Sequence, residues 1–160
     1  MTFDEAKQTI NQRLKLEPLG VEELALLEAH NRVLAENITS TLDIPPFNRS
    51  TVDGYAVKAE DTFGAEENHP AKLTVCGTVH IGETPRIIVA KGEAAEIVTG
   101  APIPEGADAV VMVEDADREN NVLSVYSAVT RGENVMKRGA DIKKGEVILK
   151  KGRVLGSREI

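Results

Sequence analysis

The stretch from Asp43 to Val57 constrains the fold of this chain more than any other segment, and it reads DIPPFNRSTVDGYAV. Two prolines stiffen an entry loop, and Arg49, Ser50 and Asp53 follow as a polar cluster. Gly54 then lets the backbone turn sharply or approach another strand closely, before an apolar run typical of a strand. Asp-Gly between β-prone runs is a common hairpin signal, so these residues taken alone favour a turn. The alternative is a surface loop that presents functional side chains.

Composition excludes several classes of function. The net charge of −7 at pH 7 argues against binding to a nucleic-acid backbone. Aromatic residues make up only 3% of the chain and Trp is absent, so a base-stacking platform is not expected either. Neither a signal peptide nor a run of membrane-spanning length is present, which indicates a cytoplasmic protein without a membrane partner.

Cysteine and histidine are too few for a disulfide or a zinc site. Cys76 is the single cysteine, and only three histidines accompany it, without the spacing of zinc ligands. Because Cys76 lies in the apolar run from Leu73 to Val79, we expect it to be a buried small hydrophobic residue.

Helical signals are confined to the first part of the chain. Thr2-Phe3-Asp4-Glu5 fits a capping box, and the apolar spacing after it predicts a helix that ends near Leu16. Val21–Ala35 is also expected to be mostly helical, although its first residues fit extended chain as well. Asn37–Leu42 is predicted to be a strand that leads into the proline loop.

Short β-prone runs separated by turn-rich pieces follow and predict a compact β-barrel or sandwich-like domain. The runs are Gly54–Val57, Leu73–Ile81, Arg86–Val89, Ala95–Thr99, Ala109–Val113 and Val122–Val129. Glu114, Asp115 and Asp117 are interpreted as a solvated acidic turn. Beyond Gly132 the chain is rich in Lys, Arg and Gly, which indicates successive tight turns.

Three sequence blocks together resemble the MoeA/gephyrin E-domain family, the molybdopterin molybdotransferases. The first is the PPF…S..DGYAV loop already described, and the second is IVTGAPIPEGADAVV at 97–111. The third is GENV at 132–135, followed by RGADI at 138–142 and KGEV at 144–147. Their order matches that of the family, and the resemblance covers essentially the whole chain.

The resemblance implies a β-rich α+β architecture with a discontinuous first domain. Residues 1–43 and 133–160 would form an elongated α/β arm, and residues 44–132 would form the inserted β barrel or sandwich-like domain. Family proteins continue into a pterin-binding α/β domain and a small C-terminal β domain, neither of which is contained in these 160 residues.

The implied activity is a step of molybdenum cofactor biosynthesis. Family enzymes transfer molybdate onto adenylylated molybdopterin and release AMP, with a divalent cation such as Mg²⁺. Each site is assembled at the interface of a homodimer, so this chain would hold half of a site and would be inactive alone. The alternative is a non-catalytic dimerisation or scaffold module of the same family. A tungstate-handling relative is not distinguished by the sequence.

The resemblance also assigns roles to individual residues. Asp53 and Thr99 match functional positions of the family, and Asp53 is the residue expected to hold Mg²⁺, since a magnesium ion prefers a few oxygen ligands. Hydrogen bonding to oxyanions is the role considered for Ser50, Arg49, Gly100 and Asp141. For Arg49, whose role rests on its charge, the alternative is a solvated surface side chain. For Ser50, ordering of the loop is an equal alternative. Asp141 follows Ala140 where the family usually has glutamate, so a turn at the surface explains it as well.

Overall fold

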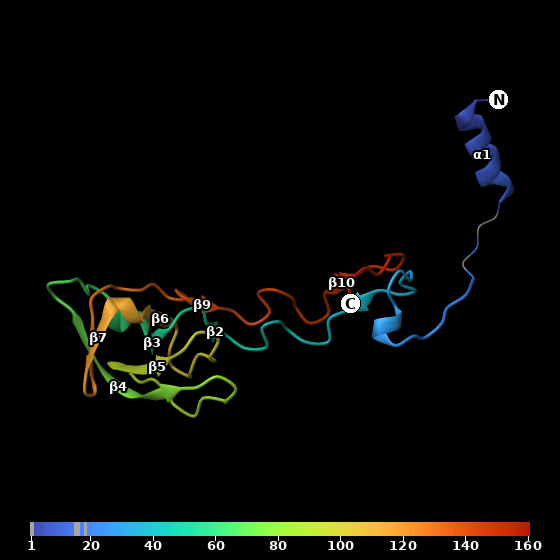
Figure 1. Cartoon of the computed structure of the whole chain (residues 1–160). Coiled ribbons are helices and arrows are strands. Elements are labelled where there is room, and N and C mark those ends of the chain that lie inside the picture. The colour runs from blue at the N-terminus through green and yellow to red at the C-terminus, as the bar shows by residue number, and fades with distance from the viewer. Residues whose placement is uncertain (1, 15–16, 18) are drawn as a thin grey trace. The chain divides into compact units, whose positions relative to one another are not determined.

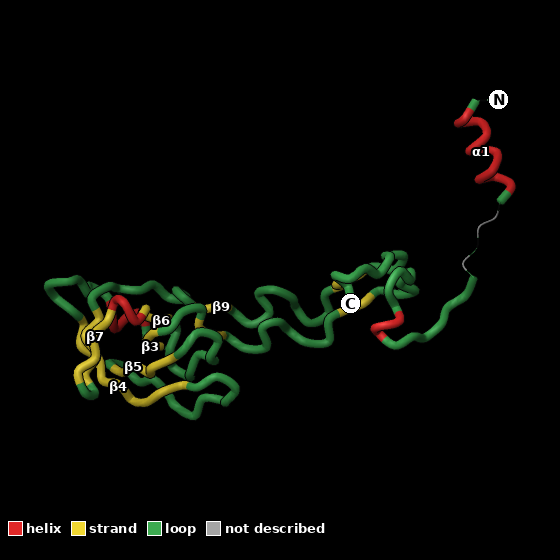
Figure 2. Tube along the Cα trace, in the orientation of Figure 1, coloured by secondary structure: helices red, strands yellow, loops and turns green. Residues whose placement is uncertain are grey.

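The computed structural model describes residues 2–14, 17 and 19–160, which divide into two compact units. One unit joins residues 1–38 to residues 149–160, and the other comprises residues 39–148. The regular structure of the described chain is mostly β with few helices, and loops connect these elements, as Figure 2 shows. The β-rich part of the fold prediction is therefore confirmed, whereas the α/β arm remains a prediction.

The predicted first helix is present as α1 (Phe3–Arg13). Its capping box forms as expected, because the Thr2 hydroxyl accepts from Glu5 N–H and the Glu5 carboxylate accepts from Thr2 N–H. Helical conformation ends earlier than expected, and Leu14 is the C-cap; Lys15 and Leu16 lie outside the described residues. The apolar face of α1 is not buried, since Phe3 is 82% exposed.

The prediction of a mostly helical segment at Val21–Ala35 is wrong. It contains only the 3-10 turn η1 (Leu26–Glu28). Backbone donors in this segment bond to a distant part of the chain instead: Asn31 N–H donates to the carbonyl of Leu155 at 2.8 Å. Asn31 also has a φ of 62°, which interrupts a right-handed helix.

A curled six-stranded sheet forms the centre of residues 39–148, with strand order β6-β3-β5-β4-β8-β7 (Figure 1). Neighbouring strands are antiparallel except for β4 and β5, which are parallel. The strands are β3 (Gly54–Val57), β4 (Ala71–Val79), β5 (Glu93–Ile97), β6 (Ala109–Met112), β7 (Ala116–Glu119) and β8 (Val122–Val125).

The structure corrects three predictions in this sheet. Arg86–Val89 is not a strand and makes only an isolated bridge from Ile88 to Glu105. The acidic segment expected as a turn instead contains the edge strand β7. The polar side chains of β7 face solvent, so its sequence lacks the alternation of apolar and polar residues that predicts a strand. Cys76 is exposed rather than buried, because alternation along β4 places it on the face opposite buried Val75.

Strands β3, β5 and β6 are covered on both faces, which explains why β3 and β6 read as continuous apolar runs. Tyr55 and Val57 of β3 belong to one hydrophobic cluster with Leu123, whereas Ala56 belongs to a second cluster with Val110. Both faces of β3 are thus buried, and the strand holds the segment before it against the core.

Four further strands pair outside this sheet. β1 (Ile38–Thr39) pairs with β10 (Val147–Leu149), so only part of the predicted strand at Asn37–Leu42 forms. β2 (Arg49–Ser50) pairs antiparallel with β9 (Val135–Met136). The 3-10 turns are η2 (Ala59–Thr62) and η3 (Val113–Asp115).

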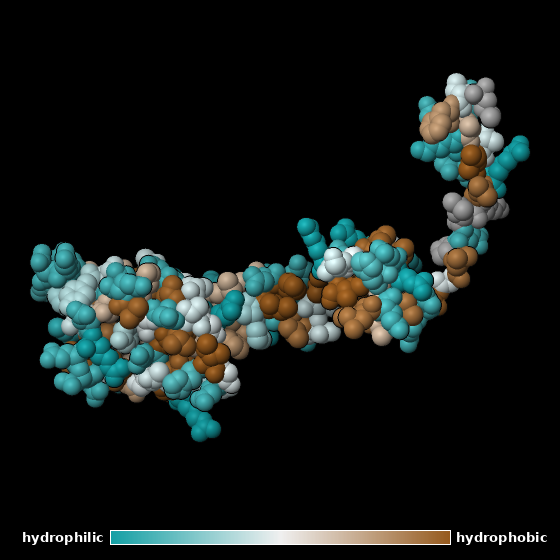
Figure 3. All heavy atoms as spheres, viewed as in Figure 1, coloured by the Kyte–Doolittle hydropathy of each residue, from teal (hydrophilic) through white to brown (hydrophobic). Residues whose placement is uncertain are grey.

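Small groups of apolar side chains are interspersed among polar ones on the face shown in Figure 3. Within the described residues, every helix is too short or too polar to cross a bilayer.

Candidate functional site

Strand β2 lies in the Asp43–Val57 segment, called the signature loop below, and hydrogen bonds join it to two other segments. Ser50 N–H donates to the Ala101 carbonyl at 2.9 Å, and Gly100 N–H donates to the Ser50 carbonyl at 2.9 Å. On the other side, Thr51 N–H donates to the Asn134 carbonyl at 3.0 Å. Residues distant in sequence are therefore joined to the loop through the backbone.

Ser50 has its hydroxyl inside the loop. The side chain is buried, and Oγ donates to the Val52 carbonyl at 2.6 Å and accepts from Val52 N–H at 3.3 Å. This arrangement supports the loop-ordering alternative for Ser50. Substrate contact by its hydroxyl stays a prediction, and it would require these bonds to be exchanged.

Gly54 is required by close backbone approach rather than by a turn. It is the first residue of β3, where a Cβ would overlap the carbonyl oxygen of Val111 on β6. Asp53 immediately precedes this strand, and its carbonyl accepts from Val113 N–H at 3.0 Å. Asp53-Gly54 is therefore the entry to a central strand and not the tip of a hairpin.

Asp53 and Thr99 form the centre of the candidate site. Oδ1 of Asp53 accepts from the Thr99 backbone N–H at 2.6 Å and from the Thr99 hydroxyl at 2.7 Å. Both residues are exposed, and the second carboxylate oxygen of Asp53 makes no hydrogen bond to the described residues. The two predicted catalytic residues are thus in contact, with one carboxylate oxygen hydrogen-bonded to Thr99 and the other without a hydrogen bond to the described residues.

These hydrogen bonds lower the pKa of Asp53 below its ordinary value. The largest cause is the backbone N–H of Thr99, followed by the Thr99 hydroxyl, and slight burial opposes both. Hydrogen bonds to the charged form favour ionisation. Asp53 is therefore a carboxylate at neutral pH, which is the form that a cation would need.

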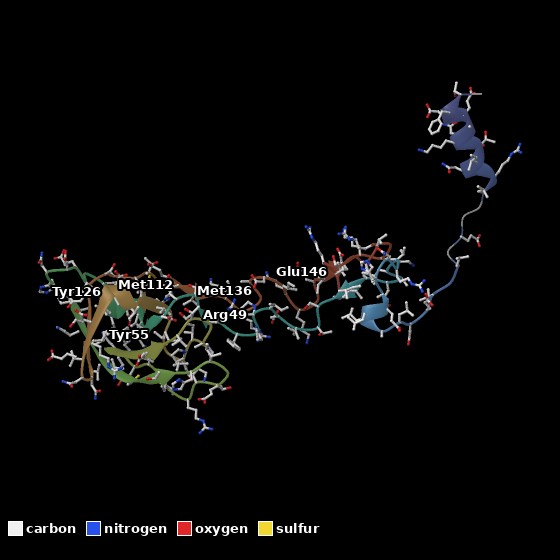
Figure 4. All side chains as sticks on the ribbon, viewed as in Figure 1. Arg49, Tyr55, Met112, Tyr126, Met136 and Glu146 are labelled. Atoms are coloured by element: carbon white, nitrogen blue, oxygen red, sulfur yellow. The ribbon has the colours of Figure 1, made fainter. Side chains whose placement is uncertain are left out.

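Arg49 lies on the other side of β2 from buried Ser50. Its Nη2 contacts the sulfur of Met136 at 3.3 Å, and Figure 4 shows the two side chains next to each other where β2 meets β9. The Nε atom is buried and makes no hydrogen bond within the described part of the chain. Arg49 forms no ion pair with any described carboxylate.

Gly100 and Asp141 are placed differently from each other. Gly100 adopts a φ of 87°, and its N–H is occupied by the Ser50 carbonyl. Asp141 is exposed and donates its backbone N–H to the Ile44 carbonyl at 2.9 Å. Its side chain makes no hydrogen bond to the other predicted site residues, so the structure joins five of the six predicted residues through β2, β3 and the turn at 99–100.

Two residues that hold this region were not predicted. Asp43 accepts from Arg138 Nε at 2.7 Å and from Lys144 N–H at 2.8 Å, and Asn48 Oδ1 accepts from Arg138 N–H at 2.9 Å. These bonds lower the pKa of Asp43, first through the Lys144 N–H and then through Arg138. The only sequence signal was their position at the two ends of the proline loop.

The donor set around Asp53 fits a weakly held hard cation and not a closed metal cage. No group of three or more His, Cys, Asp or Glu side chains in the described ranges is arranged to hold a metal. A magnesium ion is often bound by one or two carboxylates, substrate phosphates and several waters. The unbonded carboxylate oxygen of exposed Asp53 is compatible with that mode.

The chain has a curled sheet, and an Asp-Gly loop held by the distant Thr99 leads into its central strand β3. This combination can be compared with known protein families. The sequence model of the MoeA N-terminal region (domains I and II) matches residues 1–160, and the chain belongs to this family.

Named relatives agree with this assignment. The chain is 36% identical over 122 residues to a molybdopterin molybdenumtransferase of Synechococcus elongatus, covering 76% of the chain and 30% of the relative. It is 39% identical over 137 residues to a putative molybdopterin biosynthesis protein of Methanocaldococcus jannaschii, covering 86% and 31%. The chain thus spans about a third of the length of these relatives.

Solved structures of a molybdopterin biosynthesis MoeA protein from Pyrococcus horikoshii share the fold. One aligns with a TM-score of 0.84 at 46% identity and covers 99% of this chain and 40% of that protein. A second aligns with a TM-score of 0.81 at 46% identity and covers 86% and 36%.

Proposed function

We propose that this chain supplies the N-terminal half-site of a molybdenum cofactor biosynthesis enzyme that inserts molybdate into adenylylated molybdopterin and releases AMP. Family membership and the names of the relatives support this function. The observation that carries it is the Asp53–Thr99 pair, since both family positions are present and in hydrogen-bond contact.

The residues of this chain have separate tasks in that proposal. Asp53 presents its free carboxylate oxygen to the substrates, and Thr99 holds the other oxygen through its N–H and hydroxyl. A threonine hydroxyl has one proton, which is donated to Asp53 here, so Thr99 orients the carboxylate rather than donating to an oxyanion. Mg²⁺, when bound, would be held by Asp53 and would neutralise charge on the phosphate and molybdate oxygens.

The proposal includes an inter-subunit site in a homodimer, completed by a pterin-binding domain outside these 160 residues. It also includes the discontinuous arm of residues 1–43 and 133–160. The joining of residues 1–38 to 149–160 in one unit supports a discontinuous first domain, although its boundaries differ from those expected.

A chimera tests the function. Residues 1–160 replace the matching region of the Pyrococcus horikoshii protein, to which they are 46% identical. AMP release and cofactor formation are measured with adenylylated molybdopterin and molybdate. We expect an active chimera that loses activity by about 100-fold or more on Asp53→Asn, a loss typical of removing one electrostatic group from a reaction site.

The control is Asp117→Asn, which neutralises an exposed carboxylate on edge strand β7. It should leave activity unchanged, and both variants should unfold at the temperature of the parent. Full activity of the Asp53→Asn chimera would refute the proposed role of the Asp53–Thr99 pair. A folded, dimeric chimera without activity would favour the scaffold alternative.

A further inference from the structure

Arg49 is a partly buried charge without a carboxylate to balance it. Its Nε is buried without a hydrogen bond, and its Nη2 contacts only the weak acceptor sulfur of Met136. Arg118, Arg131 and Arg138 of the same unit, in contrast, each form an ion pair with a carboxylate at 2.7 or 2.8 Å. A desolvated guanidinium without a partner lowers the stability of the fold, so its presence suggests a role other than stabilising the fold.

One end of this guanidinium remains accessible. Nη1 makes no hydrogen bond to the described residues, yet it is not among their buried unsatisfied atoms, so it reaches the surface. Because protein rather than water surrounds the Nε edge, the effective dielectric around this guanidinium is lower than in water, and the group attracts an anion more strongly than a fully solvated one. Guanidinium groups bind oxyanions such as phosphate well, because their forked N–H groups match the spacing of two oxygens.

The backbone of Arg49 lies near the chain segment that carries Thr99. Arg49 forms a backbone bridge with Pro102, and Thr99 lies three residues earlier in the chain. Three residues of extended chain span at most about 10 Å. The next residue, Ser50, also accepts from Gly100 N–H, so strand β2 and the turn at 99–100 are held in a fixed relation.

We propose that Arg49 binds a tetrahedral oxyanion of the substrates through its exposed Nη edge and holds it beside Asp53 and Thr99. This inference rests on the proposed function and deepens it. The shared chemistry is an oxyanion that comes either from free molybdate or from the phosphate of the adenylylated pterin. In a chain of net charge −7, a local cation is needed to hold either anion.

Anion titration of the 160-residue chain tests the inference. The Nε–H signal of Arg49 and the backbone amides of Ser50 and Met136 are followed by NMR during addition of sodium molybdate, sodium phosphate or AMP. Sodium chloride at matched ionic strength is the reference. We expect a saturable shift with an oxyanion and none with chloride. Stronger binding of molybdate identifies the free oxometalate as the source, and stronger binding of AMP or phosphate identifies the pterin phosphate.

Three variants separate charge, geometry and packing. Arg49→Met, of similar length, should abolish the shifts of Ser50 and Met136 and raise the melting temperature, because an unbalanced buried charge is removed. Arg49→Lys keeps the charge but loses the fork, and we expect about tenfold weaker binding. Arg118→Met is the matched control, since Arg118 is already paired with Glu96, and it should bind the anions like the parent.

The inference is overturned if no oxyanion gives a saturable shift at Arg49, or if the shifts persist in Arg49→Met. A lower melting temperature of Arg49→Met would also overturn it, because the guanidinium would then serve the fold. The chimera assay tests the proposed function separately. If the chimera depends on Asp53 but Arg49 binds no anion, the proposed function stands and only the role of Arg49 is refuted.

Discussion

The substitution Ser50→Ala distinguishes a hydroxyl that orders the signature loop from one that contacts substrate. Ser50 is 1% exposed, and its Oγ satisfies both the carbonyl and the N–H of Val52. Removing Oγ leaves two partly buried backbone groups without their partner. Because one such loss destabilises a protein by about 1–3 kcal/mol, and Val52 retains some access to water, we expect a loss of about 2 kcal/mol.

Urea unfolding measures this loss. Trp is absent and the two tyrosines, Tyr55 and Tyr126, both lie in the unit of residues 39–148, so tyrosine fluorescence reports that unit. With a slope of about 1.5 kcal/mol per molar urea, the midpoint should fall by about 1.3 M. Ser127→Ala removes an exposed hydroxyl from the same unit and should change the stability by less than about 0.5 kcal/mol.

The activity of the chimera completes the comparison. If Ser50 orders the loop, Ser50→Ala should retain most activity per folded molecule at a temperature well below its transition. A midpoint equal to that of Ser127→Ala would refute the loop-ordering argument. Loss of activity at unchanged stability would instead establish the alternative role of Ser50 as a donor to substrate.

Two further predictions concern the frame around the site. Gly54→Ala should destabilise the sheet by about 3 kcal/mol in the same urea assay, because the new methyl group overlaps the Val111 carbonyl and forces β3 away from β6; an unchanged midpoint would contradict this packing. The pKa of Asp43 is lowered from 3.8 by the Lys144 N–H and then by Arg138, so its contribution to stability is complete above that value and is lost as pH falls through the lower folded pKa. Asp43→Asn should therefore flatten the fall of the urea midpoint below about pH 4, and an equally steep fall in the variant would contradict the assignment.

The sequence predicted strands best where both faces of the sheet are covered. Gly54–Val57 and Ala109–Val113 are apolar at nearly every position, and β3 and β6 occupy those places. Strand β7 escaped prediction because an edge strand with exposed side chains needs no apolar alternation. Val21–Ala35 was mispredicted for the opposite reason. Its apolar spacing fits a helix, but the N–H groups of Asn31 and Leu34 bond to carbonyls of Leu155 and Arg153, far along the chain.

The candidate site was predictable in part only. The Asp-Gly loop could be read locally, yet its contact with Thr99 joins residues 46 positions apart, which no local pattern encodes. The family resemblance assigned both residues to the site, but it did not predict that they contact each other. The Asp43 contacts, over 95 and 101 positions, had neither a local pattern nor a motif to indicate them.

The geometry of the signature loop explains why function and stability should separate at Asp53. The backbone of the loop is fixed from three sides, by Ala101 at Ser50, by Asn134 at Thr51 and by Val113 at Asp53 itself. None of these bonds uses the exposed carboxylate. An Asp53→Asn side chain retains an oxygen that can accept from Thr99, so the substitution removes the charge and leaves the frame in place. A site built in this way exposes its charged group to substrate while the fold depends on the backbone behind it.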